Sequence, residues 1–185
     1  MISTNDHELY LRFKALHAHG VTTSAKEREQ SKTRNKWERE AVVPGRNFRM
    51  PNPLAALGVS QLKKIESMNE RRRKIASIYN DALKDIEEIQ LQEVPVDCLH
   101  SYQMYPIIYQ NKENLIHHLN DKGIMASSHF DPPLHKQRAF TGIKFDSLSN
   151  TEYVSRNVIT LPIYPTMSED AATIVCQEII NFLAQ

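Results

Sequence analysis

The stretch from Gly45 to Leu62 constrains the fold of this chain most, because it predicts where irregular structure gives way to a helix. It opens with the breaker pair Pro44-Gly45, and Asn47 tolerates the unusual backbone angles of a turn. Asn52 is a suitable N-cap, and Pro53 fits the first position of a helix. We therefore predict a turn that leads directly into a helix.

Three side chains with strong hydrogen-bond donors precede this predicted helix: Arg46, Asn47 and Arg49. A helix N-terminus adds unpaired backbone N–H groups and the positive end of the helix dipole. Together these features suit an anion such as a phosphate. The alternative is a capped helix that follows a basic loop without binding anything, and spacing alone leaves both interpretations open.

Helical periodicity extends over two long stretches of the chain. Near the N-terminus, Asn5 is predicted to cap a helix, with Glu8 completing a capping box and Gly20 marking the end. Between residues 51 and 86, apolar residues spaced by three and four predict one long helix or two successive helices. The predicted buried stripe of this region consists of Leu54, Leu57, Leu62, Ile65, Ile75, Ile78, Tyr79, Ala82 and Ile86.

Beyond residue 86 the chain alternates between strand and helix patterns. Pro106 lies inside one predicted strand, which argues for an edge strand or a bulge there. The alternation predicts a small α+β domain in which helices cover a sheet. The expected strands are 89–92, 102–109, 124–129 and 158–161, and the expected helices are 112–122, 147–157 and a last one capped by Ser168.

The charge and apolar patterns argue against a nucleic-acid-binding or membrane protein. The net charge is +1, and no apolar run approaches the roughly 18 residues that a membrane span requires. Residues 71–74 are all basic, but consecutive helical residues point around the whole axis, so we predict a solvated face. Cys98 and Cys176 have no metal-type spacing and indicate reduced thiols in a cytoplasmic protein.

The segment from Val21 to Val43 is polar and locally basic. We predict a solvated loop, with the alternative that part of it lies over a nucleotide diphosphate and uses Trp37 as an anchor. This stretch also supports a second class of function. The chain would then be a non-catalytic interaction module that binds anions or nucleic acid through the basic residues before Gly45.

Several motifs in a fixed order resemble one enzyme family. They are Gly45-Arg46-Asn47-Phe48-Arg49-Met50 with a following helix that ends in Gln61-Leu62, Arg71-Arg72-Arg73-Lys74-Ile75-Ala76, His100-Ser101-Tyr102, Gly123-Ile124, His129 with Pro132-Pro133-Leu134-His135, and Leu161-Pro162-Ile163-Tyr164-Pro165. Over nearly its whole length the chain is similar to the DegT/DnrJ/EryC1/StrS family. Its members are pyridoxal-phosphate-dependent aminotransferases of fold type I that act on nucleotide-linked keto-sugars. The resemblance therefore implies that fold, that cofactor and a role in surface polysaccharide or related amino-sugar biosynthesis.

The resemblance also implies that the chain is the C-terminal part of such an enzyme. Residues 1–6 look like the end of the strand that follows the family's Schiff-base lysine, so no catalytic residue is assigned to this chain. Residues 1–50 would be a remnant of the large cofactor-binding domain with the basic connecting loop, residues 51–86 the linking helices, and residues 87–185 the α+β small domain. The expected partner is an identical subunit, in a homodimer, or a separate chain that carries the large domain. Alone, the chain is expected to be inactive and not to retain pyridoxal phosphate.

Four residues receive supporting roles from the resemblance. Asn47 matches the asparagine that reaches the cofactor phosphate of the other subunit, and Arg49 matches a position near the phosphates of the substrate. His129 and His135 would line the sugar pocket. The alternative for the two histidines is a loop position without function, and their spacing predicts no metal site.

Overall fold

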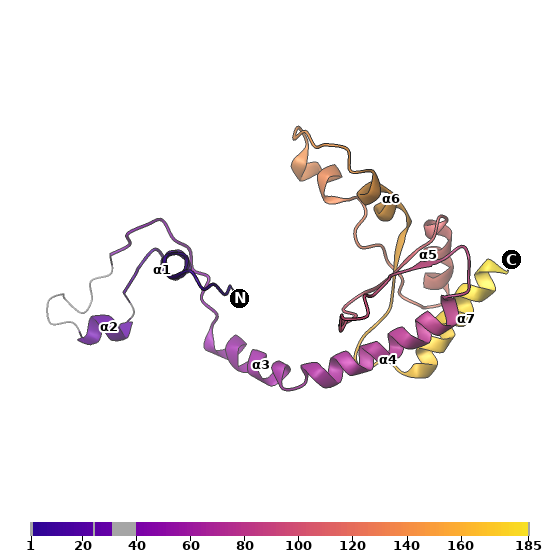
Figure 1. Cartoon of the computed structure of the whole chain (residues 1–185), viewed down its shortest axis with the longest axis horizontal. Helices are drawn as coiled ribbons and strands as arrows, with labels where there is room; N and C mark the ends of the chain where they lie inside the picture. The colour runs from indigo at the N-terminus through magenta and orange to yellow at the C-terminus, as the bar shows by residue number, and fades with distance from the viewer. Residues whose placement is uncertain (1, 24, 31–39, 185) are drawn as a thin grey trace. The chain divides into compact units, whose positions relative to one another are not determined.

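The chain forms two compact units in this computed structural model, which describes residues 2–23, 25–30 and 40–184. The N-terminal unit is Met1–Gln61 and the C-terminal unit is Leu62–Gln185. Each unit is described by itself, and Figure 1 gives the course of the chain through both.

The N-terminal unit begins with helix α1, His7–Leu16, and continues into the short helix α2, Ala25–Gln30. The carboxylate of Asp6 caps α1, because it accepts from the amides of Glu8 and Leu9 at 2.9 and 3.1 Å. The prediction of Asn5 as the cap was therefore wrong by one residue. The carbonyl of Asp6 accepts the first helical hydrogen bond, from Tyr10 at 3.0 Å, which makes Asp6 the residue beside the free amides.

Residues 46–48 pair in an antiparallel manner with residues 16–19, which lie at and just after the C-terminal end of α1. The amide of Arg46 donates to Leu16 at 2.8 Å, and the amide of Phe48 donates to His17 at 2.9 Å. The amide of His19 donates in the other direction, to the Arg46 carbonyl at 2.9 Å. We call this paired region, residues 16–20 with 43–48, the neck. Next to it, Val21 pairs with Ala41 and the Val42 amide donates to the Gly20 carbonyl, so both ends of the segment 21–42 are held together.

Gly45 was predicted as part of a turn, but in the neck it is needed because the backbone of Gly20 lies close to it. The φ angle of Gly45 is not positive, so no left-handed turn requires it. A Cβ atom at this position would instead lie 2.1 Å from the amide nitrogen of Gly20. The bend in the chain lies at residues 42–43, just before the predicted turn at Pro44-Gly45, which has no regular structure.

Two successive helices follow, α3 (Asn52–Leu62) and α4 (Ile65–Leu83), as one of the two predicted alternatives had it. The amide of Ala55 donates to the Pro51 carbonyl at 3.0 Å, so the cap lies at Pro51, and Asn52, the predicted cap, is the first residue of α3. The predicted buried stripe is confirmed for α4 from Ile75 onward, but not for Ile65, the first residue of that helix, which is 48% exposed. In α3 the stripe faces solvent, because no described residue of its unit covers it; its exposed side chains include Leu54, Leu57, Val59 and Leu62.

The C-terminal unit is built on a three-stranded antiparallel sheet in the order β1-β2-β3: Gln90–Leu91, Tyr105–Ile108 and Val158–Leu161. Pro106 lies in the middle strand, opposite Thr160 of β3. Proline has no amide to donate to a neighbouring strand, but Pro106 is tolerated here because β1 pairs only with Ile107 and Ile108 and ends before reaching Pro106. The missing amide of Pro106 therefore interrupts no described ladder.

The predicted strand at 124–129 is wrong. Only Ser127 pairs with Thr160, through two backbone hydrogen bonds of 2.7 and 3.2 Å. The residues before it are used to end the preceding helix: the Ile124 amide donates to Leu119 and the Ala126 amide donates to the Asn120 side chain. These contacts turn the backbone out of the extended path that a strand needs.

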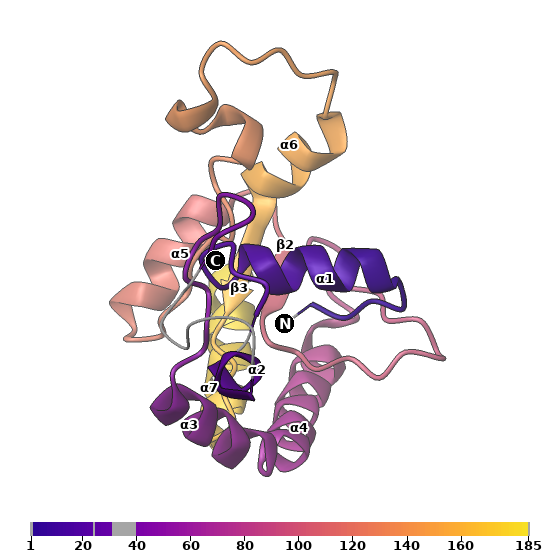
Figure 2. The same ribbon diagram turned by 90° about the vertical axis from the view of Figure 1, so that its left-hand side faces the viewer.

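Helices cover the sheet as predicted. Helix α7, Glu169–Leu183, packs along α4 and also against α5, Lys112–Asp121, as the two views agree (Figures 1 and 2). Helix α6, Ser149–Asn157, precedes β3, and two short 3-10 turns, Leu134–Lys136 and Arg138–Phe140, lie in the loop before it. The largest fully buried side chains of the core are Tyr79, Leu83, Ile107, Leu115, Leu119, Ile159, Leu161 and Ile179.

Two tyrosine hydroxyls are satisfied inside this core. The Tyr79 hydroxyl donates to the Pro162 carbonyl at 2.7 Å, and the Tyr105 hydroxyl donates to the Asn80 side chain at 2.5 Å. Burial raises the pKa of both hydroxyls well above the ordinary value of a tyrosine. Both groups therefore act as neutral donors.

Candidate functional site

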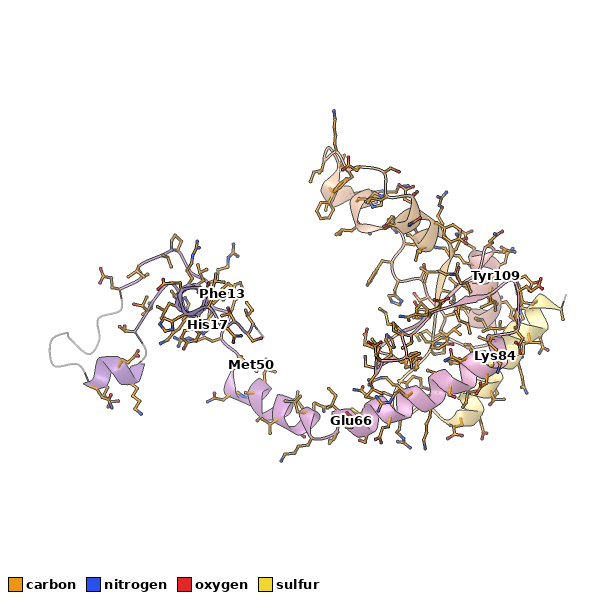
Figure 3. All side chains as sticks on the ribbon, in the orientation of Figure 1. Phe13, His17, Met50, Glu66, Lys84 and Tyr109 are labelled. Atoms are coloured by element: carbon orange, nitrogen blue, oxygen red, sulfur yellow. The ribbon has the colours of Figure 1, made fainter. Side chains whose placement is uncertain are left out.

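The predicted cofactor and phosphate residues lie beside a pocket of about 490 Å³ in the N-terminal unit. The end of α1 contributes Lys14 and His17 to its lining, and the segment after the neck contributes Phe48, Arg49 and Met50. Figure 3 labels His17 on α1 and Met50 at the approach to α3. The pocket therefore combines cationic and imidazole groups with apolar ones.

Arg49 is the cation of this pocket that has no other partner. Its guanidinium is exposed and makes no hydrogen bond or ion pair with any described residue. Lys14, in contrast, lies 4.0 Å from Glu27. The Nδ1 of His17 faces the carbonyls of Phe13 and Lys14 at 3.1 and 2.8 Å, so the ring is engaged at the C-terminal end of α1, where the helix dipole favours an imidazole.

Asn47 lies in the neck, opposite Ala18. Its neighbours Arg46 and Phe48 make the backbone hydrogen bonds of this pairing, so the position of Asn47 is fixed from both sides. The Asn47 carboxamide is exposed and has no hydrogen-bond partner among the described residues. Asn47 thus presents a polar side chain that no described residue engages, on a backbone fixed by the hydrogen bonds of its neighbours. Trp37, the predicted anchor in the basic loop, lies outside the described residues.

The two predicted histidines belong to the C-terminal unit, in the loop between α5 and α6. His129 Nδ1 lies 3.0 Å from the Thr160 hydroxyl of β3. Its side chain lines a largely apolar hollow of about 460 Å³ together with Phe130, Leu134 and Val154. This position suits a polar contact at the wall of an apolar site.

His135 lies further along the same loop and is not among the residues that line this hollow. Its Nε2 lies 3.3 Å from Glu152 of α6, and the Nζ of Lys136 lies 2.6 Å from the other oxygen of that carboxylate. The hydrogen bond from Lys136, and then that from His135, holds the pKa of Glu152 below its ordinary range. Glu152 thus fixes the part of the loop that contains His135 and Lys136 to α6.

Lys112 is the residue of this region that sequence reasoning missed. It is the first residue of α5, and its side chain is only 7% exposed. The Nζ donates to Asp131 at 2.6 Å, to the Ser155 carbonyl at 2.7 Å and to the Ser128 hydroxyl at 3.2 Å. Its partners are 16, 19 and 43 residues away, so no local spacing could have revealed the cluster.

Metal and membrane features are limited in the part of the chain that the structure describes. No three histidine, cysteine, aspartate or glutamate side chains gather there as metal ligands. Neither cysteine forms a disulfide; Cys98 is exposed and Cys176 is buried. No described helix is both long and apolar enough to span a bilayer.

Comparison with known proteins gives a consistent result. A family model described as the DegT/DnrJ/EryC1/StrS aminotransferase family matches residues 1–180. The chain is 32% identical over 180 residues to the spore coat polysaccharide biosynthesis protein SpsC of Bacillus subtilis, which covers 92% of this chain and 46% of that protein. It is 30% identical over 185 residues to the GDP-perosamine synthase of Escherichia coli O157:H7, with 98% and 46% covered. The chain thus spans about half the length of the curated relatives it matches.

The chain also matches about half of the length of solved aminotransferase structures. A DegT/DnrJ/EryC1/StrS aminotransferase from Brucella abortus superposes with a TM-score of 0.82 at 27% identity, over 98% of this chain and 45% of that one. The predicted combination of helices and a small sheet is therefore confirmed as the fold of part of an aminotransferase chain. The coverage also agrees with the expectation of a segment.

Proposed function

Because the chain belongs to the DegT/DnrJ/EryC1/StrS aminotransferase family, we propose that it is a segment of a pyridoxal-phosphate-dependent enzyme that aminates a nucleotide-linked keto-sugar. The relatives' names include a polysaccharide biosynthesis protein and a GDP-sugar synthase, which supports this substrate class. The observation that carries the proposal is a pair of donors that no described residue engages: Asn47, in the neck, and Arg49, directly after the neck on the wall of a pocket.

Asn47 would contact the cofactor phosphate of a neighbouring subunit. A phosphate accepts hydrogen bonds, and the exposed Asn47 carboxamide offers two N–H donors that no described residue uses. The residue therefore fits the group chemically. When bound, pyridoxal phosphate supplies the electron sink through which the amino group moves.

Arg49 would bind the phosphates of the nucleotide sugar. A guanidinium presents planar pairs of donors that match phosphate oxygens, and the Arg49 group is not engaged elsewhere in the described chain. His17 and Lys14 add further polar groups to the same pocket. In this proposal the pocket wall that carries Arg49 holds the charged part of the substrate.

The loop from His129 to His135 would border the sugar. The His129 ring already lines a hollow with apolar side chains, an arrangement that orients a small ligand through few polar contacts. His135 lies at the other end of the loop, and Glu152 orients its ring. Both histidines are assigned to substrate binding and neither to proton transfer.

We assign the covalent bond to the cofactor to a lysine outside this chain. Lys112 is the buried lysine of the described residues, and all three protons of its ammonium are donated to oxygen atoms. The catalytic assembly would therefore need a homodimer or a complementing partner that carries the large domain. The free cysteines fit a reducing cytoplasmic location.

The proposal is tested by joining the chain, through fusion or co-expression, to the part of a relative that it does not match. Asn47→Ala should weaken cofactor retention roughly ten- to a hundredfold, since a hydrogen bond to a charged group is worth about 1.5–3 kcal/mol. Arg49→Ala should instead raise the KM for the nucleotide sugar. Arg46→Ala is the matched control, because Arg46 is an exposed arginine of the same segment that is not among the residues lining the pocket.

A mixed dimer tests whether the Asn47 contact crosses subunits. One subunit carries Asn47→Ala and the other lacks the cofactor-binding lysine. If the contact crosses, one site combines both defects and the other site has neither, so activity should return in the mixture. A verified heterodimer without activity would remove the cross-subunit role of Asn47.

A further inference from the structure

Lys112 is an unusual residue at its place in the fold. It begins α5, where the positive end of the helix dipole disfavours a cation. It is also 6% exposed, although lysines are rarely buried and a buried ammonium loses its hydration. A lysine at this position therefore does not stabilise helix α5 through the helix dipole. The contacts of its ammonium group explain its position instead.

These contacts join three segments of the C-terminal unit. From α5, the Nζ donates to the Ser128 hydroxyl and the Asp131 carboxylate, both in the loop, and to the carbonyl of Ser155 in α6. The Ser155 hydroxyl in turn donates to the Phe130 carbonyl at 2.7 Å. Every residue of the loop from 128 to 131 except His129 is thus held by this cluster.

His129 lies between the two loop partners of Lys112. The cluster fixes the backbone before it through Ser128 and after it through Phe130 and Asp131. Among the described residues, the ring itself has a hydrogen-bond contact with the Thr160 hydroxyl on β3, at 3.0 Å, and an edge contact with the ring of Phe130, whose carbonyl the cluster holds. The orientation of the ring toward the hollow therefore depends on where the cluster sets the backbone.

We propose that Lys112 is a positioning residue, which holds residues 128–131 so that the His129 ring lines the hollow with Leu134 and Val154. The value of this position for a sugar substrate rests on the function proposed above. The positioning of residues 128–131 is independent of that function and can be measured on the chain without any substrate.

The test compares Lys112→Met with Lys112→Arg in the full chain. Methionine has a similar length and removes all three donors, and the Asp131 carboxylate that loses its partner is 40% exposed, so water can solvate it. We expect Lys112→Met to raise hydrogen exchange of the 128–131 amides at least tenfold and to move the NMR signals of the His129 ring toward those of a free histidine. Arginine keeps a cation with several donors, so Lys112→Arg should keep exchange within about twofold of the wild type.

Two controls make the outcome specific. Lys122→Met removes an exposed lysine at the other end of α5 and should change neither measurement. His129→Gln identifies the ring signals. Unchanged exchange and unchanged ring signals in Lys112→Met would overturn the proposal, as would a uniform rise in exchange over all of α7, which indicates a general loss of stability.

If Lys112→Met does not fold, Asp131→Asn takes its place. This change keeps the shape of the side chain and removes the charge that lies 2.6 Å from the Nζ. It should raise exchange at 128–131 and leave α7 protected, and an unchanged loop would equally overturn the proposal. Because no nucleotide sugar is present in these measurements, a failure of the proposed function leaves their result intact.

Discussion

A Cβ atom on Gly45 would lie 2.1 Å from the amide nitrogen of Gly20, so the two glycines let the backbone of the neck close. The reverse also holds, because a Cβ on Gly20 would lie 1.7 Å from the Val43 carbonyl oxygen. Asn47 and Arg49 follow directly after this contact. The position of both proposed phosphate ligands therefore depends on two residues that have no side chains.

Gly45→Ala should open the neck. The clash is with backbone atoms, which cannot rotate away, and overpacking of this kind costs about 1–3 kcal/mol. We expect faster hydrogen exchange at the amides of His19, Arg46 and Phe48, which donate across the neck. Gly58→Ala is the control, because a Cβ there meets nothing within 4 Å and alanine in a helix should stabilise by roughly 0.5–1 kcal/mol. Wild-type exchange in Gly45→Ala would contradict the role given to this contact.

Tyr79→Phe should destabilise the C-terminal unit without changing its fold. It removes the hydroxyl that donates to the Pro162 carbonyl at 2.7 Å and leaves that carbonyl without its partner. An unpaired buried polar group costs about 1–3 kcal/mol, measurable by denaturant unfolding. Tyr153→Phe removes the hydroxyl of a tyrosine that is 45% exposed and should stay within about 0.5 kcal/mol of the wild type. Equal stabilities of the two variants would contradict this account.

Local signals predicted much of the C-terminal unit. Ser168 caps α7 through the Ala171 amide at 3.1 Å, and Ala172, Val175 and Ile179 are buried as their spacing requires. Helix α5 and strand β3 were likewise predicted close to their observed bounds. In each case the signal lies in the element itself or in a residue next to it in the sequence.

The features that sequence reasoning missed depend on residues outside the segment concerned. The apolar pattern of 124–129 is that of a strand, but the Asn120 side chain and the Leu119 carbonyl bind the first amides of this stretch. Gly45 was recognised as special, yet its close contact with Gly20 cannot be read from a sequence. His135 gave no sign of Glu152, which is 17 residues away.

The two cysteines should react at very different rates. Cys98 is exposed, whereas Cys176 lies in the core on α7 and burial raises its pKa to about 11. At pH 8 only about one thousandth of the Cys176 thiol would be ionised, and the thiolate is the reactive form. A thiol-reactive dye should therefore modify one cysteine in the folded chain and the second only in denaturant. Cys98→Ser should abolish the fast reaction, and two fast thiols in the wild type would contradict the burial of Cys176.

Glu152 should anchor the His135 end of the loop in a pH-dependent way. Its pKa is lowered in the folded chain, first by the hydrogen bond from Lys136 and then by that from His135. A carboxyl group with a lowered pKa stabilises the fold above its unfolded value of about 4.3, and this contribution is lost as the pH falls through the folded value. Carboxyl-detected NMR should therefore give a midpoint for Glu152 below that value.

Three variants separate the causes of this shift. Lys136→Met removes its largest cause, the contact at 2.6 Å, and should move the Glu152 midpoint back toward the ordinary glutamate range. Lys122→Met removes a positive charge that no described contact links to Glu152 and should leave the midpoint in place. In Glu152→Gln the amides of Lys136 and Gln137 should exchange faster at pH 7, because the loop has lost its anchor on α6. The same midpoint in Lys136→Met as in the wild type would show that another group holds the carboxylate ionised.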